Sequence, residues 1–196
     1  MKHIGDFLNK NGYNVDYAAY PSRKNTIEEI SANWIKPLLQ NPCSQKAKKI
    51  HFVTHSMGGI IVRYFLQENR VKNLGRVVML APPSQGSEVA DFLSHSLFLK
   101  AKLGPALLQL KADPSSFVNT LGLPNFEFAI IAGNASIDPV SSLILPGDDD
   151  GKVTIARSRL KNSSDFLLVE ENHTFIMDAP AVQQATLRFL KNGKFQ

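Results

Sequence analysis

The segment from Ile50 to Leu66 constrains the fold more than any other part of the chain. An apolar run from Ile50 to Val53 ends just before Ser56, two glycines follow at 58 and 59, and a second apolar run begins. This pattern predicts a buried strand that turns sharply into a helix, with the serine at the bend. A serine at such a bend is expected to have a strained backbone and an exposed hydroxyl, beside unpaired N–H groups at the helix start. Small residues are needed there because the strand and the helix approach closely.

The bulk composition limits the class of protein. The chain has 196 residues, of which 43% are hydrophobic and 20% charged, so it can form one large globular domain with a substantial core. Its net charge of +5 comes from scattered basic residues, and the densest cluster, at 46–49, has no interleaved aromatic side chains, which disfavours nucleic-acid binding. The single cysteine, Cys43, excludes an intrachain disulfide. No apolar stretch is long enough to span a bilayer, and the first residues lack the layout of a signal peptide.

Helical and strand patterns alternate along the chain. A capping box at 26–29 begins a helix with one apolar face, and Pro37 is expected to kink or end it. Strands separated by helices predict an α/β fold with a mainly parallel sheet flanked by helices. The predicted strands cover residues 13–20, 49–54, 75–80, 127–132 and 165–169, and the other main predicted helices cover residues 2–10, about 57–69 and about 179–191.

The segment 83–125 interrupts this alternation. A helix is predicted to begin at Ser87, and an apolar stretch follows that includes Leu97, Phe98, Leu99, Leu103, Leu107, Leu108 and Leu110. An apolar insertion between two strands can form a cap over a pocket for apolar substrates. It can equally consist of ordinary core helices, which show the same periodicity, and the sequence does not separate the two interpretations.

A serine needs a base before it can act as a nucleophile, and an imidazole suits this role near neutral pH. The chain contains five histidines. His173 follows the last predicted strand and precedes the last helix, which is where a parallel sheet places its active site. His3, His51 and His95 have no such pattern, and His55, inside the serine turn, is expected to point elsewhere.

An acid must orient the histidine, and the acidic run at 148–150 supplies the strongest candidates. Asp150 is followed by a glycine, and Asp-Gly is typical of a tight turn that leaves the carboxylate able to point inward. A solvated acidic loop is the alternative interpretation, and Asp138 is a second candidate for the acid. Ser56, Asp150 and His173 follow one another in the order expected of one hydrolase fold.

Four segments in order resemble the α/β-hydrolase lipase and esterase group, and more narrowly small bacterial triacylglycerol lipases and inositol-deacylase-like proteins. These segments are Thr54–Gly59, Ala81–Asp91, Asp149–Val153 and Asn172–Thr174. The resemblance covers most of the chain and implies one α/β-hydrolase domain over residues 1–196, with the helical insertion at 83–125. It implies hydrolysis of carboxylic esters through an acyl-enzyme, without a metal or an organic cofactor.

The resemblance also implies a role for each candidate residue. Ser56 corresponds to the nucleophile, His173 to its base, Asp150 to the orienting acid with Asp149 as the alternative, and the Met57 N–H to one oxyanion donor. The implied substrate is a small acyl ester or a lipid, and contact with a membrane surface and the oligomeric state stay open. An acyltransferase that uses the same three residues and a non-catalytic protein with this fold are the alternative functions.

The sequence departs from the family pattern at two places. Thr54 stands where the motif usually has glycine, and its side chain is bulkier. The family has a strand and a His-Gly loop immediately before the first helix, and this loop supplies the second oxyanion donor. Neither is in this sequence, so we expect an N-terminally shortened form of a longer enzyme. As it stands the chain is expected in the cytoplasm, whereas a missing segment would allow export or membrane anchoring.

Overall fold

The computed structural model describes residues 1–95, 103–138 and 143–196. Its centre is a four-stranded sheet in which every strand pairing is parallel. The strands, in the order that they take in the sheet, are β1 (Ile50–His55), β2 (Leu74–Leu80), β3 (Phe128–Gly133) and β4 (Asp165–Val169). The predicted α/β class with a parallel sheet is confirmed, because four of the predicted strands form and pair as expected.

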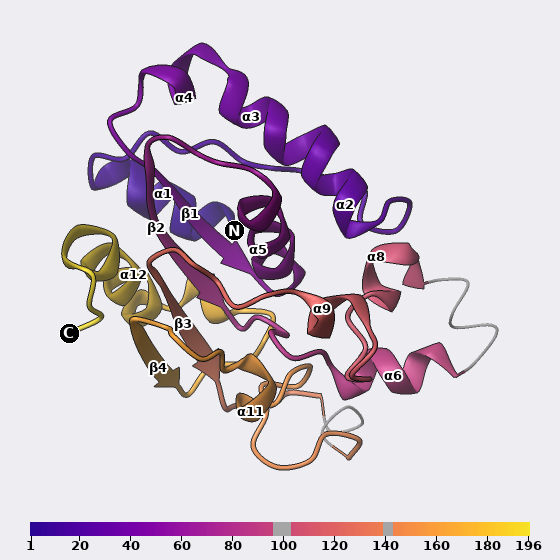
Figure 1. Cartoon of the computed structure of the whole chain (residues 1–196). Helices are drawn as coiled ribbons and strands as arrows, with labels where there is room; N and C mark the ends of the chain where they lie inside the picture. Colours follow the sequence, from indigo (N-terminus) through magenta and orange to yellow (C-terminus); the bar gives the residue numbers. More distant parts are fainter. Residues whose placement is uncertain (96–102, 139–142) are drawn as a thin grey trace.

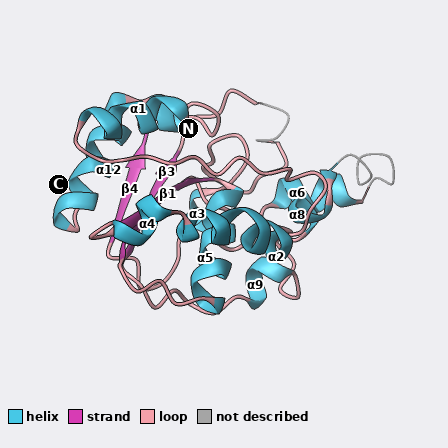
Figure 2. Cartoon of the chain, turned by 90° about the horizontal axis from the view of Figure 1, so that it is seen from above, coloured by secondary structure: helices cyan, strands magenta, loops and turns pink. Residues whose placement is uncertain are grey.

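Helices cover both faces of the sheet, as Figures 1 and 2 show. Successive side chains of a strand point to opposite faces, so Val77 and Met79 pack on one side of β2 and Val78 and Leu80 on the other. All four are fully buried, as expected of a strand with a helical layer on each side. The first layer contains α2 (Ile27–Ile30) and α5 (Met57–Glu68), and the second contains α1 (Lys2–Lys10) and α12 (Pro180–Asn192).

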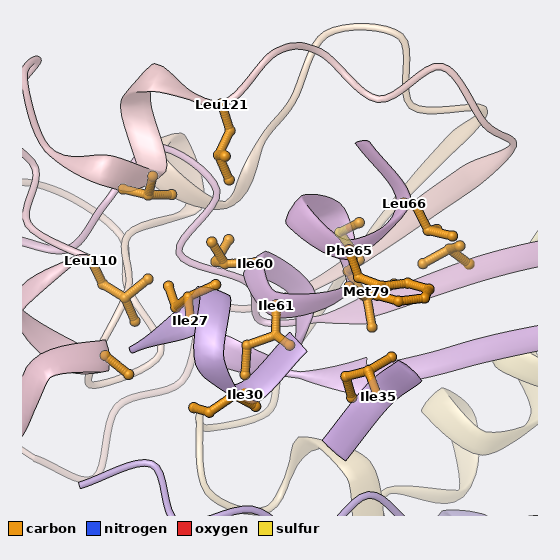
Figure 3. Close-up of a cluster of buried hydrophobic side chains, with 14 of the residues drawn as sticks. Ile27, Ile30, Ile35, Ile60, Ile61, Phe65, Leu66, Met79, Leu110 and Leu121 are labelled. Carbon is orange, nitrogen blue, oxygen red and sulfur yellow. The ribbon is translucent and has the colours of Figure 1, made fainter. Parts of the chain in front are cut away.

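The larger core lies between α5 and the sheet and is drawn in Figure 3. Its side chains come from α2, from α5 and from the strands, and include Ile27, Ile30, Ile60, Ile61, Phe65, Met79, Phe128 and Ile130. Burial of one large apolar side chain contributes about 1.5–3 kcal/mol. The core therefore holds α5 firmly against β1 and β2, and with it the turn that carries Ser56.

The helices before β1 follow the predicted signals. The capping box at the start of α2 is present, because the Glu29 N–H donates to Thr26 Oγ1 over 3.2 Å and the Thr26 N–H donates to Glu29 Oε2 over 2.9 Å. Pro37 does not end the helical run. A π-helical turn at Ser31–Ile35 leads into α3 (Lys36–Gln40), whose first turn contains the proline, so the helix changes type there. The short helix α4 (Pro42–Lys46) follows.

The strand predicted at residues 13–20 is wrong, because this segment forms no regular secondary structure. Its side chains explain the apolar pattern in another way. Tyr13 and Val15 pack with the α12 layer, whereas Tyr20 packs with the α5 layer. The segment therefore crosses from one helical layer to the other. Its apolar residues fix that crossing rather than one face of a strand.

Short helices occupy the described parts of the region between β2 and β3. They are α6 (Glu88–Ser94), α8 (Pro105–Leu108) and α9 (Phe117–Thr120). Ala90, Ala106, Leu110 and Val118 from this region are buried in the α5 core, so its described part contributes to the hydrophobic interior. The residues at 97–99 lie outside the described part of the chain, and the cap stays a prediction.

Arg63 joins this region to α5. Its side chain is buried and donates to the backbone carbonyls of Leu121 (2.7 Å), Ser84 (3.0 Å) and Gly122 (3.1 Å). Burial lowers the pKa of the guanidinium from 12.5 to about 10. The three carbonyls lie in the segments after β2 and before β3, so one side chain fixes both segments to the helix that follows Ser56.

We predict that Arg63→Met lowers the free energy of unfolding by about 3 kcal/mol, because buried carbonyls would lose their donors. Urea unfolding followed by circular dichroism measures this loss. The control Arg70→Met, at an exposed position of the following loop, should change stability by less than about 0.5 kcal/mol. Equal effects of the two variants would contradict the role given to Arg63.

Candidate active site

Ser56 lies between the end of β1 and the start of α5, as the strand–turn–helix pattern predicts. Its backbone angles are φ 52° and ψ −128°, a conformation that residues other than glycine rarely adopt. The Ser56 N–H donates to the Leu80 carbonyl of β2 over 2.9 Å, which ties the turn to the neighbouring strand. Among the described residues, no carbonyl or side chain accepts a hydrogen bond from the Met57 N–H at the helix start.

The two glycines after the turn differ in how tightly they are enclosed. A Cβ on Gly59 would lie 3.2 Å from the Pro82 Cβ, which is closer than ordinary contacts allow. A Cβ on Gly58 would lie 3.5 Å from the Tyr20 hydroxyl, an ordinary contact distance. The close approach expected from the sequence therefore occurs chiefly at Gly59.

The structure brings Ser56, Asp150 and His173 together in one chain of hydrogen bonds. His173 Nε2 lies 3.0 Å from Ser56 Oγ, although the two residues are 117 positions apart. His173 Nδ1 lies 2.8 Å from Asp150 Oδ2. The histidine side chain is 12% exposed and the aspartate side chain 1% exposed, so solvent has little access to the bond between them.

Asp150 is held by the turn that follows it. Its Oδ1 accepts from the Lys152 N–H over 3.0 Å and from the Val153 N–H over 2.9 Å, which leaves Oδ2 for His173. Two amide donors and the imidazole compensate the buried carboxylate. Asp150 is thus the acidic candidate whose carboxylate bonds the histidine. Asp149 Oδ1 accepts from the Gly151 N–H over 2.6 Å, and Asp138 forms an ion pair with Lys152 over 2.6 Å.

Three other histidines have partners away from this chain. His51 Nδ1 accepts from the Arg76 N–H over 2.9 Å, His95 Nδ1 lies 2.7 Å from the Asp91 carbonyl oxygen, and His3 Nδ1 lies 3.0 Å from Asp178 Oδ1. They have no contact with Ser56 in the described structure, in agreement with the sequence analysis.

The expectation for His55 is wrong. Instead of pointing elsewhere, its ring lies against that of His173, with 4.8 Å between the ring centroids. Its Nε2 lies 2.8 Å from the His173 carbonyl oxygen. The position of a side chain inside a strained turn depends on the loop that packs over it, and sequence spacing contains no information about that loop.

Known proteins share this arrangement of elements. The lecithin:cholesterol acyltransferase family model matches residues 1–93. The mature form of the lipase BlEst2 from Bacillus licheniformis superposes with a TM-score of 0.72 at 22% identity, over 96% of this chain and 82% of the lipase. The metagenomic carboxyl esterase MGS0156 gives a TM-score of 0.69 at 21% identity, over 88% of this chain and 58% of the esterase. The chain has the α/β-hydrolase fold.

A further solved structure also superposes on this chain. The phospholipase PlaB from Legionella pneumophila superposes with a TM-score of 0.61 at 20% identity, over 80% of this chain and 42% of the phospholipase. A search of curated proteins finds no match. Ser56, Asp150 and His173 follow strands whose carboxyl ends meet at one edge of the parallel sheet, and their chain order is the one expected of this fold.

Sequence reasoning missed Gly133, at the end of β3. A Cβ at this position would lie 2.2 Å from the Glu171 carbonyl oxygen and 3.1 Å from the Asp150 Cβ. Only a residue without a side chain lets the Asp150 turn and the loop before His173 approach the strand this closely. The sequence does show a glycine at the end of an apolar strand, but many strands end in this way, so this feature alone does not predict a close approach of other segments.

The described residues contain no group of three or more His, Cys, Asp or Glu side chains that could hold a metal ion. Across those same residues, no helix has the length and apolar character needed to cross a membrane. Two surface cavities lie near the amino ends of the strands, one lined by residues of β4 and the C-terminus and the other by the end of α5. Neither includes Ser56, Asp150 or His173.

Burial and, to a smaller extent, the nearby His173 lower the pKa of His55 from 6.5 to about 4, against the opposing effects of the bonded carbonyl and Asp150. The charged amino terminus also lowers the pKa of His55. The folded protein therefore holds His55 neutral while the unfolded chain takes up a proton near pH 6.5. Below that pH the unfolded state binds more protons, so stability falls with pH until about pH 4.

We predict that wild-type protein loses about 2 kcal/mol more unfolding free energy than His55→Gln when the pH falls from about 7 to about 5. Glutamine does not titrate, so the variant lacks this contribution. Urea unfolding at the two pH values measures the difference. Identical losses in the two proteins would show that His55 protonates as easily in the folded state as in the unfolded state.

Proposed function

We propose that this chain is a serine hydrolase that cleaves carboxylic esters through an acyl-enzyme. The hydrogen-bonded chain from Ser56 through His173 to Asp150 is the observation that carries the proposal. The fold supports it, because lipases and esterases are among the solved proteins that superpose on this chain.

In the proposed reaction, Ser56 Oγ attacks the ester carbonyl carbon while His173 Nε2 accepts the hydroxyl proton. The tetrahedral intermediate collapses, and the alcohol leaves with the proton from the imidazolium. Water then attacks the acyl-enzyme with the same histidine as base, which releases the acid and restores Ser56. The strained turn presents the hydroxyl to the substrate, and the His173 Nε2, at 3.0 Å, is within proton-transfer reach.

Asp150 orients the imidazole and stabilises its charge. A carboxylate that accepts from Nδ1–H leaves Nε2 unprotonated toward Ser56, which is the tautomer that can act as a base. The amides of Lys152 and Val153 fix the Asp150 carboxylate in one position, and the fixed carboxylate in turn orients the His173 ring.

The Met57 N–H is the proposed oxyanion donor, since it lies directly after the nucleophile at the start of α5. In the lipases that the sequence resembles, a second N–H comes from the loop after a strand beside the serine strand. The outer side of β1 has no strand partner among the described residues, and we assign no residue of this chain to that second role. One missing donor typically lowers turnover about a hundred- to a thousandfold.

Acyl transfer is the second candidate function. The family model that matches residues 1–93 is that of an acyltransferase, and an acyl-enzyme can be attacked by an alcohol in place of water. Incubation with an ester and a competing alcohol, followed by product analysis, separates the two reactions. Free acid as the main product supports the hydrolase, and a new ester as the main product supports the transferase.

We predict that Ser56→Ala and His173→Ala reduce the hydrolysis of p-nitrophenyl esters to nearly the same residual rate, because the three residues act as a unit. Asp150→Asn should lower kcat by about a thousandfold or more, since the imidazole would lose its orienting carboxylate. A panel of esters of increasing acyl length gives the rates and the preferred substrate.

Asp149→Asn is the matched control, because this neighbouring carboxylate accepts from the Gly151 N–H in the turn, whereas Asp150 bonds His173. It should retain activity within about tenfold of wild type. Full activity of Ser56→Ala would contradict the proposed function. Equal losses in the Asp149 and Asp150 variants would contradict the assignment of the acid.

A further inference from the structure

The main chain of His173 is held from both sides. Its N–H donates to the Asp150 carbonyl over 2.8 Å, and its carbonyl accepts from His55 Nε2 over 2.8 Å. The first bond connects the histidine loop to the proposed acid. The second connects it to the residue directly before the proposed nucleophile.

The chemistry of the second bond sets the state of the His55 ring. A backbone carbonyl only accepts hydrogen bonds, so Nε2 must carry the proton. Burial and the facing His173 both disfavour a charge on this ring, while Asp150 and the carbonyl favour it less strongly. His55 is thus a neutral donor at pH values above about 4. A neutral His55 ring therefore places no positive charge against His173 when His173 holds the proton taken from Ser56.

The rest of the histidine loop depends mainly on its own turn. Asn172 Oδ1 accepts from the N–H groups of Thr174 and Phe175, each over 3.1 Å. These bonds shape the loop but do not connect it to the serine turn. Within the described structure, two hydrogen bonds join the two turns: the His173 Nε2–Ser56 Oγ bond itself and the bond from His55 to the His173 carbonyl.

We propose that His55 is a positioning residue that donates a hydrogen bond from the serine turn to the His173 carbonyl and thereby holds the imidazole within reach of Ser56. This inference rests on the proposed function. His55 directly precedes Ser56 in the chain. A shift of the histidine loop relative to Ser56 would therefore break the bond between His55 Nε2 and the His173 carbonyl. The alternative is a histidine that only fills space beside the turn.

Two substitutions of His55 separate these roles. His55→Phe keeps an aromatic ring of similar size and removes the donor. His55→Gln keeps an amide N–H that can reach the same carbonyl. We expect kcat in the Phe variant to fall about ten- to a hundredfold, with KM within about twofold of wild type, because the partly buried His173 carbonyl loses its donor and the base loses its position. The Gln variant should recover kcat to within about fivefold of wild type.

Amide hydrogen exchange of residues 171–175 gives a readout that does not need catalysis. Exchange should be faster in His55→Phe and near wild type in His55→Gln, since only the former frees the loop. His51→Phe is the matched control, because this histidine is on the same strand and bonds the Arg76 N–H instead. It should reduce stability while kcat and exchange at 171–175 stay at wild-type values.

Faster loop exchange in the Phe variant with recovery by Gln supports the inference, even if the wild-type protein hydrolyses no ester, in which case only the proposed function fails. Unchanged loop exchange and kcat in His55→Phe would overturn it. Equal losses in the Phe and Gln variants would also overturn it, because they would show that ring packing rather than the hydrogen bond matters.

Discussion

The bond from the Ser56 N–H to the Leu80 carbonyl fixes the strained turn to the parallel sheet, and the arrangement of the candidate site depends on it. A backbone with φ 52° at serine persists only where its surroundings hold it. Here the surroundings are β2 on one side and the buried face of α5 on the other. The bond to β2 and the packing of the α5 core therefore maintain the conformation of the turn together.

A second constraint is the close approach of three segments at the carboxyl edge of the sheet. The end of β3 lies against the Asp150 turn and the Glu171 carbonyl, where Gly133 leaves no room for a side chain. The His173 N–H then bonds the Asp150 carbonyl, so the proposed acid and base share backbone as well as side-chain contacts. His55 adds a neutral donor from β1, so side chains from the segments after β1, β3 and β4 meet at this edge of the sheet.

Much of this arrangement was predictable, because long periodic segments and turn signals are local properties of the sequence. The strand–turn–helix at Ser56 and the position of His173 after the last strand follow from such signals. The Asp-Gly signal favoured Asp150, but Asp149 precedes the same turn, and it is the folded loop that shows Asp150 Oδ2 facing the histidine.

The failures have a common physical cause. The residues at 13–20 have an apolar pattern suited to a strand, but their side chains divide between two helical layers. The roles of His55 and Gly133 depend on contacts with loops that are distant in sequence. Tertiary contacts determine the conformation of the 13–20 segment and the roles of these two residues, and local sequence propensity does not contain that information.

The most direct test of the account is a mass measurement of the folded chain after treatment with a fluorophosphonate. An activated serine forms a covalent phosphonyl adduct, whereas an ordinary surface serine does not. The account predicts one adduct, located at Ser56 by peptide mapping and absent from His173→Ala. Folded wild-type protein that stays unmodified, or an adduct on another serine, would contradict the claim that Ser56 is an activated nucleophile.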